Sequence, residues 1–167
     1  MTKRANGKRR PPMNPLRVYA DTSVFGGVGD DEFASLSRAF FDRVAGGEVT
    51  VLVSQITYNE LAAAPSCVRR VLERLEPGQV EEVPAGQEVR ALADAYAAHG
   101  ALGGGARDDA LHVAAATVAG ADAIVSWNFR HIVNLDRIRK FNGVNALMGY
   151  RPVEIRSPLE LLHDNEN

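Results

Sequence analysis

Short runs of consecutive apolar residues alternate along the chain with segments in which apolar residues recur every three or four positions. The apolar runs cover residues 16–20, 49–54 and 123–126, and weaker runs cover residues 79–83 and 153–155. Continuous apolar runs of this length are typical of strands that are buried on both faces of a parallel sheet. We therefore predict five strands, with residues 79–83 at an edge of the sheet.

The segments between these runs have helical periodicity. Residues 31–45 carry an apolar stripe at helical spacing and end at a glycine pair. The same pattern predicts a helix that Ser54 caps and Pro65 closes, and further helices over residues 66–75, 87–98, 108–119 and 133–147, with a closing turn at 157–162. Strands that alternate with helices of this length favour an α/β fold, a three-layer α/β/α sandwich with a mostly parallel central sheet.

Size and composition place few further bounds on the chain. Its 167 residues are enough for one domain with a real core, and 46% apolar and 24% charged residues are ordinary for a soluble protein. No apolar stretch is long enough to span a bilayer, and the basic first residues lack the apolar segment of a secretory signal. The single cysteine excludes an internal disulfide and favours a cytoplasmic location.

The basic residues are concentrated at the start of the chain. Residues 1–17 hold six of the 19 basic residues and no acidic one, which leaves the remainder with a net charge of about −8. We divide the chain into a basic leader, residues 1–15, and one domain, residues 16–160. The leader is either an arm that follows a phosphate backbone or a disordered, variable tail, and we favour the tail.

Polar residues follow the predicted strands at their carboxyl ends, where parallel sheets bind ligands. Asp21 follows the first strand, Glu60 lies in the helix after the second, and Asp108 and Asp109 begin a helix rich in small residues. Separate carboxylates that converge on one cleft stay ionised only if a cation neutralises them. Oxygen ligands of this kind favour Mg²⁺ or Mn²⁺ over zinc.

Three motifs give the sequence a family resemblance. The segments "VYADTSVFGG", "SQITYNELAAAP" and "RDDALHVAAATVAGADAIVSWNFRHIV" resemble the PIN domain, and more narrowly its VapC-like toxin branch. The resemblance covers residues 16–157, nearly the whole chain. It implies an α/β/α fold and a metal-dependent ribonuclease that hydrolyses RNA phosphodiester bonds. It also implies a role as the toxin of a toxin–antitoxin pair, a small antitoxin as partner, and a homodimer.

The resemblance also assigns roles to individual residues. Asp21, Glu60 and Asp109 match the acids that hold one or two Mg²⁺ or Mn²⁺ ions, and Glu60 could orient the attacking water or take its proton. Asn128 stands at the position of a fourth acid, which puts a second metal in doubt because an amide carries no charge. We count all four as catalytic residues and read Asp108 as a helix N-terminal acid or an outer group.

We assign substrate contacts to five further residues. Thr22 or Ser23 could fix the Asp21 carboxylate or contact a phosphate. His112, three residues after Asp109, lies at the edge of the metal or donates to a phosphate, or else is a hydrogen-bonded histidine at the sheet interface. Arg130 and His131 follow the last buried strand, where a basic side chain could hold the RNA backbone.

Two other functions are open to a sequence of this kind. A haloacid-dehalogenase-like phosphatase also places an aspartate at the end of its first strand, but it needs a second aspartate two residues later, where this chain has Ser23. We discount it for that reason. A non-catalytic PIN module that binds RNA or protein is the second alternative, and the uncharged Asn128 favours it.

Overall fold

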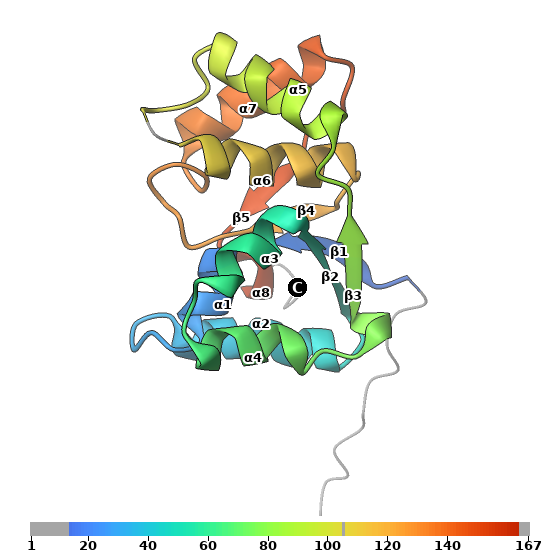
Figure 1. Ribbon diagram of the computed structural model, residues 1–167, viewed down its shortest axis with the longest axis vertical. Helices are drawn as coiled ribbons and strands as arrows, with labels where there is room; N and C mark the ends of the chain where they lie inside the picture. Colours follow the sequence, from blue (N-terminus) through green and yellow to red (C-terminus); the bar gives the residue numbers. More distant parts are fainter. Residues whose placement is uncertain (1–13, 105, 164–167) are drawn as a thin grey trace, which may run out of the picture.

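Five parallel strands form one central sheet in the computed structural model, which describes residues 14–104 and 106–163 (Figure 1). The strand order is β3-β2-β1-β4-β5, and all four neighbouring pairs are parallel. The bounds are β1 Leu16–Ala20, β2 Val49–Ser54, β3 Val80–Val83, β4 Ala123–Val125 and β5 Glu154–Arg156. The five predicted strands are therefore confirmed, including the edge position of β3.

The central strand β1 shows why the apolar runs are continuous. Val18, Tyr19 and Ala20 are fully buried, although alternate residues of a strand point to opposite faces. Val18 is paired with Val51 of β2 on one side and with Ala123 of β4 on the other. Both faces of β1 are covered by helices from Val18 onward, so these positions need predominantly apolar side chains.

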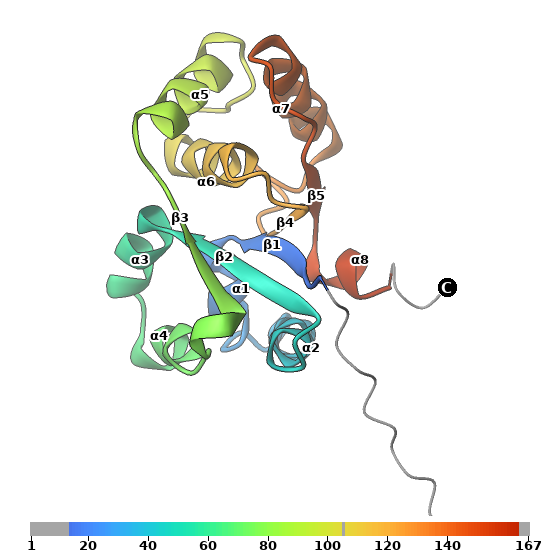
Figure 2. The same cartoon turned by 90° about the vertical axis from the view of Figure 1, so that its right-hand side faces the viewer.

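One layer of helices covers the face to which Tyr19 points. It contains α5 (Gln87–Ala98), α6 (Arg107–Val118) and α7 (Leu135–Leu147). Figure 2 shows these three helices together on one side of the sheet. Their buried side chains form one core cluster with Tyr19 and Leu52, and Ala110 and Ala114 of α6 are fully buried in it. The small residues of α6 let this helix approach the sheet closely.

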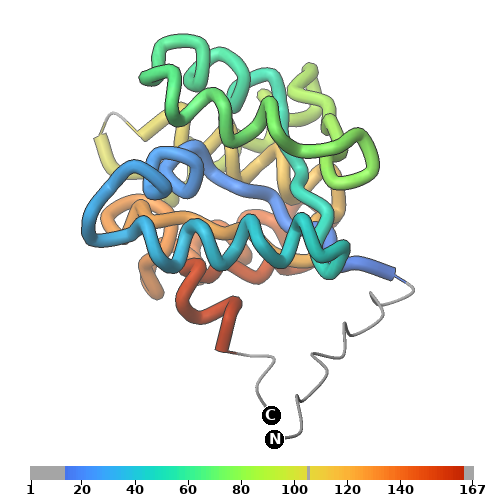
Figure 3. The backbone as a smooth tube through the Cα atoms, turned by 90° about the horizontal axis from the view of Figure 1, so that it is seen from below, coloured from blue at the N-terminus to red at the C-terminus, as the bar shows by residue number. Residues whose placement is uncertain are grey.

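A second helix layer covers the opposite face. It contains α1 (Thr22–Gly27), α2 (Ala34–Ala45), α4 (Ser66–Glu73) and α8 (Pro158–His163). The helix α8 lies beside α2, as the view in Figure 3 shows. The remaining helix, α3 (Gln55–Ala62), starts directly at the carboxyl end of β2, and a short 3₁₀ turn, Pro77–Gln79, leads into β3. The predicted three-layer α/β/α sandwich is therefore confirmed.

Two helix predictions are corrected by the structure. The helix expected over residues 31–45 begins at Ala34, and a separate helix, α1, precedes it where none was expected. The helix expected from residue 133 begins at Leu135, because Asn134 caps it: its side-chain oxygen accepts hydrogen bonds from the backbone N–H groups of Asp136 and Arg137.

The proposed basic leader falls almost entirely outside the described residues, which begin at residue 14. Within the described ranges, none of the helices combines the length and the apolar character that a transmembrane span requires.

Candidate metal centre

Asp21 lies at the carboxyl end of β1, the middle strand of the sheet. Its backbone N–H donates to the carbonyl of Val125 at 3.0 Å, so β4 fixes the position of the backbone. The side chain is only 5% exposed, and its Oδ2 atom accepts hydrogen bonds from Ser23 Oγ at 2.6 Å and Ser126 Oγ at 2.7 Å. The two hydroxyls hold one carboxylate oxygen and leave Oδ1 directed at His112 Nε2, 3.7 Å away.

Glu60 reaches the same place from α3. Its Oε2 atom accepts a short hydrogen bond from the hydroxyl of Thr22 and lies 3.1 Å from His112 Nε2. Partial burial by itself raises the pKa of the Glu60 carboxyl, but the hydrogen bonds from His112 and Thr22 outweigh it and lower the pKa below its usual value. Glu60 is therefore an ionised carboxylate at neutral pH.

His112 joins the two acids from α6, where it is only 1% exposed. Burial opposes a charge on the imidazole ring. The hydrogen bond to Glu60 and the negative charges of Asp21 and Glu60 oppose that effect and raise the pKa of His112 to about 10. A proton on Nε2 therefore offsets the charge of the two carboxylates as long as nothing else occupies the space between them.

Tyr19 contacts the other ring nitrogen of His112. Its hydroxyl lies 2.8 Å from His112 Nδ1 and 2.8 Å from Ser54 Oγ, and the Thr57 hydroxyl is 3.4 Å away. Tyr19, Ser54, Thr57 and His112 are all buried. This buried polar network links β1, β2, α3 and α6, so the orientation of the His112 ring is fixed by elements from three separate parts of the chain.

Asp109 lies one turn before His112 on α6. Burial and the negative charge of Asp21 raise the pKa of its carboxyl, while His131 and the hydrogen bond from Asn128 oppose this rise. Asn128 Nδ2 donates to Asp109 Oδ1 at 3.1 Å, and Asn128 Oδ1 accepts from the backbone N–H of His131 at 2.9 Å. Both ends of the Asn128 amide are thus engaged within the protein, and Asn128 orients Asp109.

The structure brings most of the predicted site residues together. Asp21, Glu60 and His112 each offer a ligand atom within 4.8 Å of the others, and we call these three residues the carboxylate–histidine cluster. Among the described residues, this group does not include Asp109, which lies beside it. Thr22 contacts Glu60, not Asp21, whereas Ser23 does contact Asp21.

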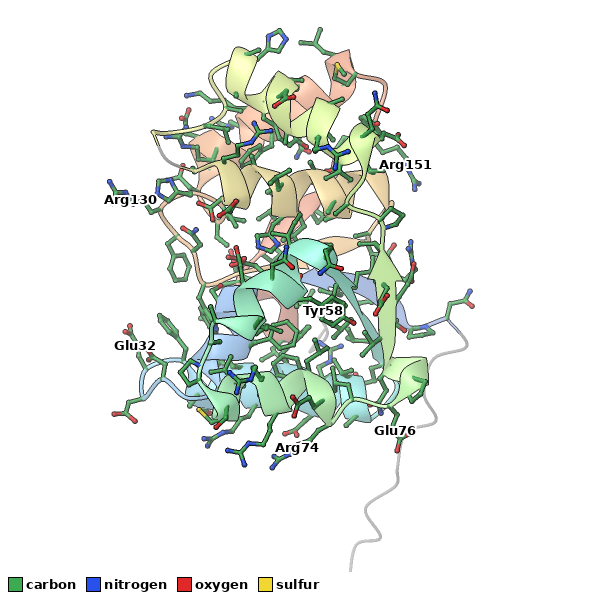
Figure 4. The ribbon with its side chains drawn as sticks, viewed as in Figure 1. Glu32, Tyr58, Arg74, Glu76, Arg130 and Arg151 are labelled. Atoms are coloured by element: carbon green, nitrogen blue, oxygen red, sulfur yellow. The ribbon has the colours of Figure 1, made fainter. Side chains whose placement is uncertain are left out.

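The basic residues after β4 lie outside the carboxylate–histidine cluster. Arg130 is exposed, and Figure 4 shows it projecting outward from the molecule. His131 is half-buried, and its Nδ1 atom is buried without a hydrogen-bond partner among the described residues. Arg137, further along the chain, donates to the carbonyl of Ala101 at 3.0 Å and so anchors the loop before α6. Asp108 is exposed, consistent with an acid in the first turn of a helix.

Two functional residues were not assigned from the sequence. Ser126 donates to Asp21 from the carboxyl end of β4, and the hydroxyl of Tyr19 contacts the ring of His112. The sequence does contain one signal, because Tyr19 places a hydroxyl within an otherwise aliphatic buried strand, and such a hydroxyl needs a partner.

The donor set fits a divalent cation. Asp21 is almost fully buried, yet no hydrogen bond from the described residues reaches its Oδ1 atom, which faces Glu60 and His112. Carboxylate oxygens and an imidazole nitrogen that converge in this way are a donor set that could hold a metal ion. Asp21 and Glu60 are the acids that would hold the ion, with Asp109 beside them.

A groove of about 530 Å³ lies elsewhere on the molecule, between α3, α4 and the edge strand β3. Tyr58 and Glu76, both labelled in Figure 4, line it together with Leu72 and Val80. No member of the carboxylate–histidine cluster lines this groove, so it does not belong to the candidate metal centre.

Solved structures share this fold. No protein-family model and no curated protein matches the sequence. A chain of VapBC2 from Rickettsia felis, bound to a DNA fragment from their promoter, aligns with a TM-score of 0.52 and 11% identity, over 85% of this chain and 98% of that chain. DNA-bound VapBC from Salmonella typhimurium aligns with a TM-score of 0.51 and 16% identity, over 86% of this chain and 98% of that chain. FitAcB from Neisseria gonorrhoeae aligns with a TM-score of 0.50 and 17% identity, over 85% of this chain and 98% of that chain.

At these identities the likeness is one of fold, and it extends over nearly the whole of each matched chain. The parallel five-stranded sheet with helices on both faces agrees with it. The fold expected from the sequence motifs is therefore confirmed, and the chain has the PIN-like α/β/α fold of the VapBC and FitAcB structures.

Proposed function

We propose that this protein is a metal-dependent endoribonuclease and acts in the cytoplasm as the toxin of a toxin–antitoxin pair. The observation that supports this most is the carboxylate–histidine cluster, in which Asp21 and Glu60 come from different elements and meet at the carboxyl edge of the sheet with Asp109 beside them. Acids gathered at this edge of a PIN-like fold favour metal-assisted hydrolysis of a phosphodiester.

Each residue of the centre has a chemical task in this proposal. A bound Mg²⁺ or Mn²⁺ ion would supply Lewis-acid polarisation of the phosphate and activation of water. Ser23 and Ser126 hold Asp21 in one orientation. Glu60 is ionised and fixed by Thr22 and His112, so it can accept a proton from the attacking water.

Substrate and partners complete the proposal. RNA is the proposed substrate, and the exposed Arg130 is available to a backbone phosphate. His112 is too deeply buried to contact a phosphate in this conformation. Of its two predicted roles, we therefore prefer the one at the edge of the metal. A small antitoxin that covers the site and a homodimer remain proposals. Co-expression with the product of a neighbouring reading frame, followed by co-purification and mass measurement, tests both.

Neighbouring aspartates on α6 provide the test of the nuclease. Asp109 lies at the centre and Asp108 is exposed, so Asp109→Asn and Asp108→Asn remove the same charge from adjacent positions. In Mn²⁺ or Mg²⁺, we expect Asp109→Asn and Asp21→Asn to lose at least about 100-fold of the cleavage of total RNA. Asp108→Asn should cleave like the wild type, and EDTA should abolish cleavage in both.

Circular dichroism of each variant shows whether the fold is kept. Undiminished cleavage in both Asp21→Asn and Asp109→Asn refutes the nuclease assignment. The alternative, a non-catalytic PIN module that binds RNA or protein, is favoured by the uncharged Asn128, whose amide is engaged by Asp109 and His131. That alternative predicts binding of Mg²⁺ in calorimetry, lost in Asp21→Asn, with no metal-dependent cleavage by the wild type.

A further inference from the structure

His112 occupies a position suited to a metal ligand. An ion held by bonds of about 2.1 Å places neighbouring ligand atoms roughly 3 Å apart. His112 Nε2 lies 3.1 Å from Glu60 Oε2 and 3.7 Å from Asp21 Oδ1. The ring nitrogen therefore lies at ligand spacing from Glu60 and less than about 1 Å beyond it from Asp21. Small movements of the side chains would bring all three atoms into a single coordination sphere.

The second ring nitrogen is held in the way that metal-binding histidines usually are. His112 Nδ1 is 2.8 Å from the Tyr19 hydroxyl, which is itself 2.8 Å from Ser54 Oγ. The hydroxyl can accept from Nδ1–H while it donates to Ser54, and this arrangement leaves the lone pair of Nε2 facing the acids. Partners that fix the tautomer and the ring in this manner typically accompany ligating histidines.

Tyr19 cannot drift from this position, because it is fully buried in the central strand. Its ring also packs edge-on against the His112 ring, with the ring centres 5.7 Å apart. The orientation of Nε2 is therefore built into the core of the fold and does not depend on a surface loop.

We propose that His112 is a direct nitrogen ligand of the divalent ion, together with Asp21 and Glu60, and that Tyr19 is the residue that positions it. This inference rests on the proposed metal-dependent function. It replaces an all-oxygen set of ligands with a mixed set of two carboxylates and one imidazole, and Asp109 lies beside these ligands.

A mixed set of ligands changes which metal the protein prefers. Mg²⁺ favours oxygen ligands, whereas imidazole nitrogen binds the transition metals more strongly. The centre should therefore prefer Mn²⁺ to Mg²⁺, and the preference should come from His112 specifically.

Pulsed electron paramagnetic resonance of bound Mn²⁺ tests the nitrogen ligand directly, because it detects magnetic coupling to a coordinated ¹⁴N nucleus. The full chain is freed of metal and loaded with less than one equivalent of Mn²⁺. We expect the coupling of an imidazole nitrogen in the wild type, and its replacement by a ¹⁵N pattern when the protein is made with ¹⁵N-histidine. The labelled wild type keeps the test valid even if a variant does not fold.

Three histidine variants identify which ring is bound. His112→Gln should lose the ¹⁴N coupling and bind Mn²⁺ at least about tenfold more weakly. The same change should reduce the preference for Mn²⁺ over Mg²⁺, measured by competition, by about tenfold or more. His99→Gln, at an exposed position, and His131→Gln, near Asp109, should keep the wild-type coupling.

Tyr19→Phe separates positioning from ligation. This variant should keep the ¹⁴N coupling and lose about tenfold in Mn²⁺ affinity, because the ring is no longer held by a hydroxyl. Mn²⁺ that binds the wild type without ¹⁴N coupling overturns the inference and leaves the nuclease proposal intact. Coupling that survives in His112→Gln, or disappears only in His131→Gln, also overturns it. Failure of the wild type to bind either Mn²⁺ or Mg²⁺ removes the proposed function as well.

Discussion

Gly27, at the end of α1, stands against a buried pair of side chains that adjoins the candidate metal centre. Trp127 Nε1 donates to Ser37 Oγ at 2.8 Å, and the Trp127 backbone N–H donates to Ser23 Oγ, which in turn holds Asp21. A methyl group at position 27 would lie 2.9 Å from Trp127 Nε1 and would also collide with the Ser37 hydroxyl. Glycine is therefore required here by close packing.

We predict that Gly27→Ala destabilises the protein by about 1–3 kcal/mol, because the rigid indole ring and α2 must move to admit a methyl group. Gly26→Ala is the matched control, since a methyl group at position 26 meets nothing within 4 Å. This control should be neutral or slightly stabilising, because alanine favours a helix more than glycine does. Urea unfolding followed by circular dichroism measures both, and equal stability of the two variants would contradict the packing argument.

The carboxylate of Asp109 is expected to serve function at a cost in stability. Burial and the charge of Asp21 raise the pKa of its carboxyl, which means that the ionised form is disfavoured in the folded state. We predict that Asp109→Asn stabilises the metal-free protein, on the order of 0.5 kcal/mol, while it abolishes RNA cleavage. Urea unfolding in EDTA measures the gain. Asp108→Asn should leave stability unchanged, and a clear loss of stability in Asp109→Asn would show that this charge is well accommodated.

At the scale of elements, Arg17 ties together three parts of the fold at the amino end of the sheet. From β1 its guanidinium crosses β2 and donates to both carboxylate oxygens of Glu81 on β3, at 2.9 and 2.6 Å. It also donates to the carbonyls of Ala119 and Gly120, where α6 turns toward β4. Two-point contact of this kind fixes geometry as well as charge.

The Arg17–Glu81 pair predicts a pH dependence of stability. The hydrogen bond from Arg17 holds the pKa of Glu81 below its usual 4.5. Because the folded-state pKa is lowered, the stabilisation is present above that usual value and is lost as the pH falls through the folded-state pKa. Both side chains are more than a third exposed, so solvent limits the effect to below about 1 kcal/mol.

Urea unfolding of Glu81→Gln and the wild type at pH 7 and at pH 3 measures this difference. We expect the variant to be less stable than the wild type at pH 7 and the gap to close at pH 3. Glu73→Gln, at an exposed position on α4, should show no gap at either pH. If the stability difference between Glu81→Gln and the wild type instead grew toward pH 3, the Arg17–Glu81 pair would not be the source of the stabilisation.

Most elements of the fold follow from the sequence because both faces of the sheet are covered. Every position of the strand Leu16–Ala20 from Val18 onward is buried, so its apolar run carries a clear signal. The helix α1 lacks such a signal. Its six residues, Thr22–Gly27, end in two glycines, and the helix is stabilised by packing of Val24 and Phe25 into the core, which no local pattern reveals.

The same contrast applies to the candidate centre. The positions of Asp21 and Glu60 could be predicted, because the carboxyl ends of parallel strands meet at one edge of the sheet. The contacts of His112 with Tyr19 and of Ser126 with Asp21 could not, because each joins side chains about a hundred positions apart in the chain. Such contacts depend on the register of β1 against β4 and on the exact rotation of α6.

At the scale of the whole molecule, the candidate centre joins segments that unfolding would separate. Asp21 follows the central strand, Glu60 belongs to α3, and His112 belongs to α6 in the helix layer on one face. A ligand shared by these three elements binds the folded chain only, because no unfolded conformation brings the three side chains together. Its binding energy therefore appears as stability of the entire domain.

We predict that Mn²⁺ at one hundred times its dissociation constant stabilises the protein by about 2.7 kcal/mol, which corresponds to a rise of about 5–11 °C in melting temperature for a chain of this size. Calorimetry with Mn²⁺ or with EDTA measures the shift. Asp21→Asn should melt at the same temperature in both, because the carboxylate at the end of the central strand is then absent. Asp94→Asn, at an exposed position on α5, should keep the full shift. A shift of equal size in Asp21→Asn would mean that the ion binds elsewhere on the surface, and the three elements would then not be coupled through this centre.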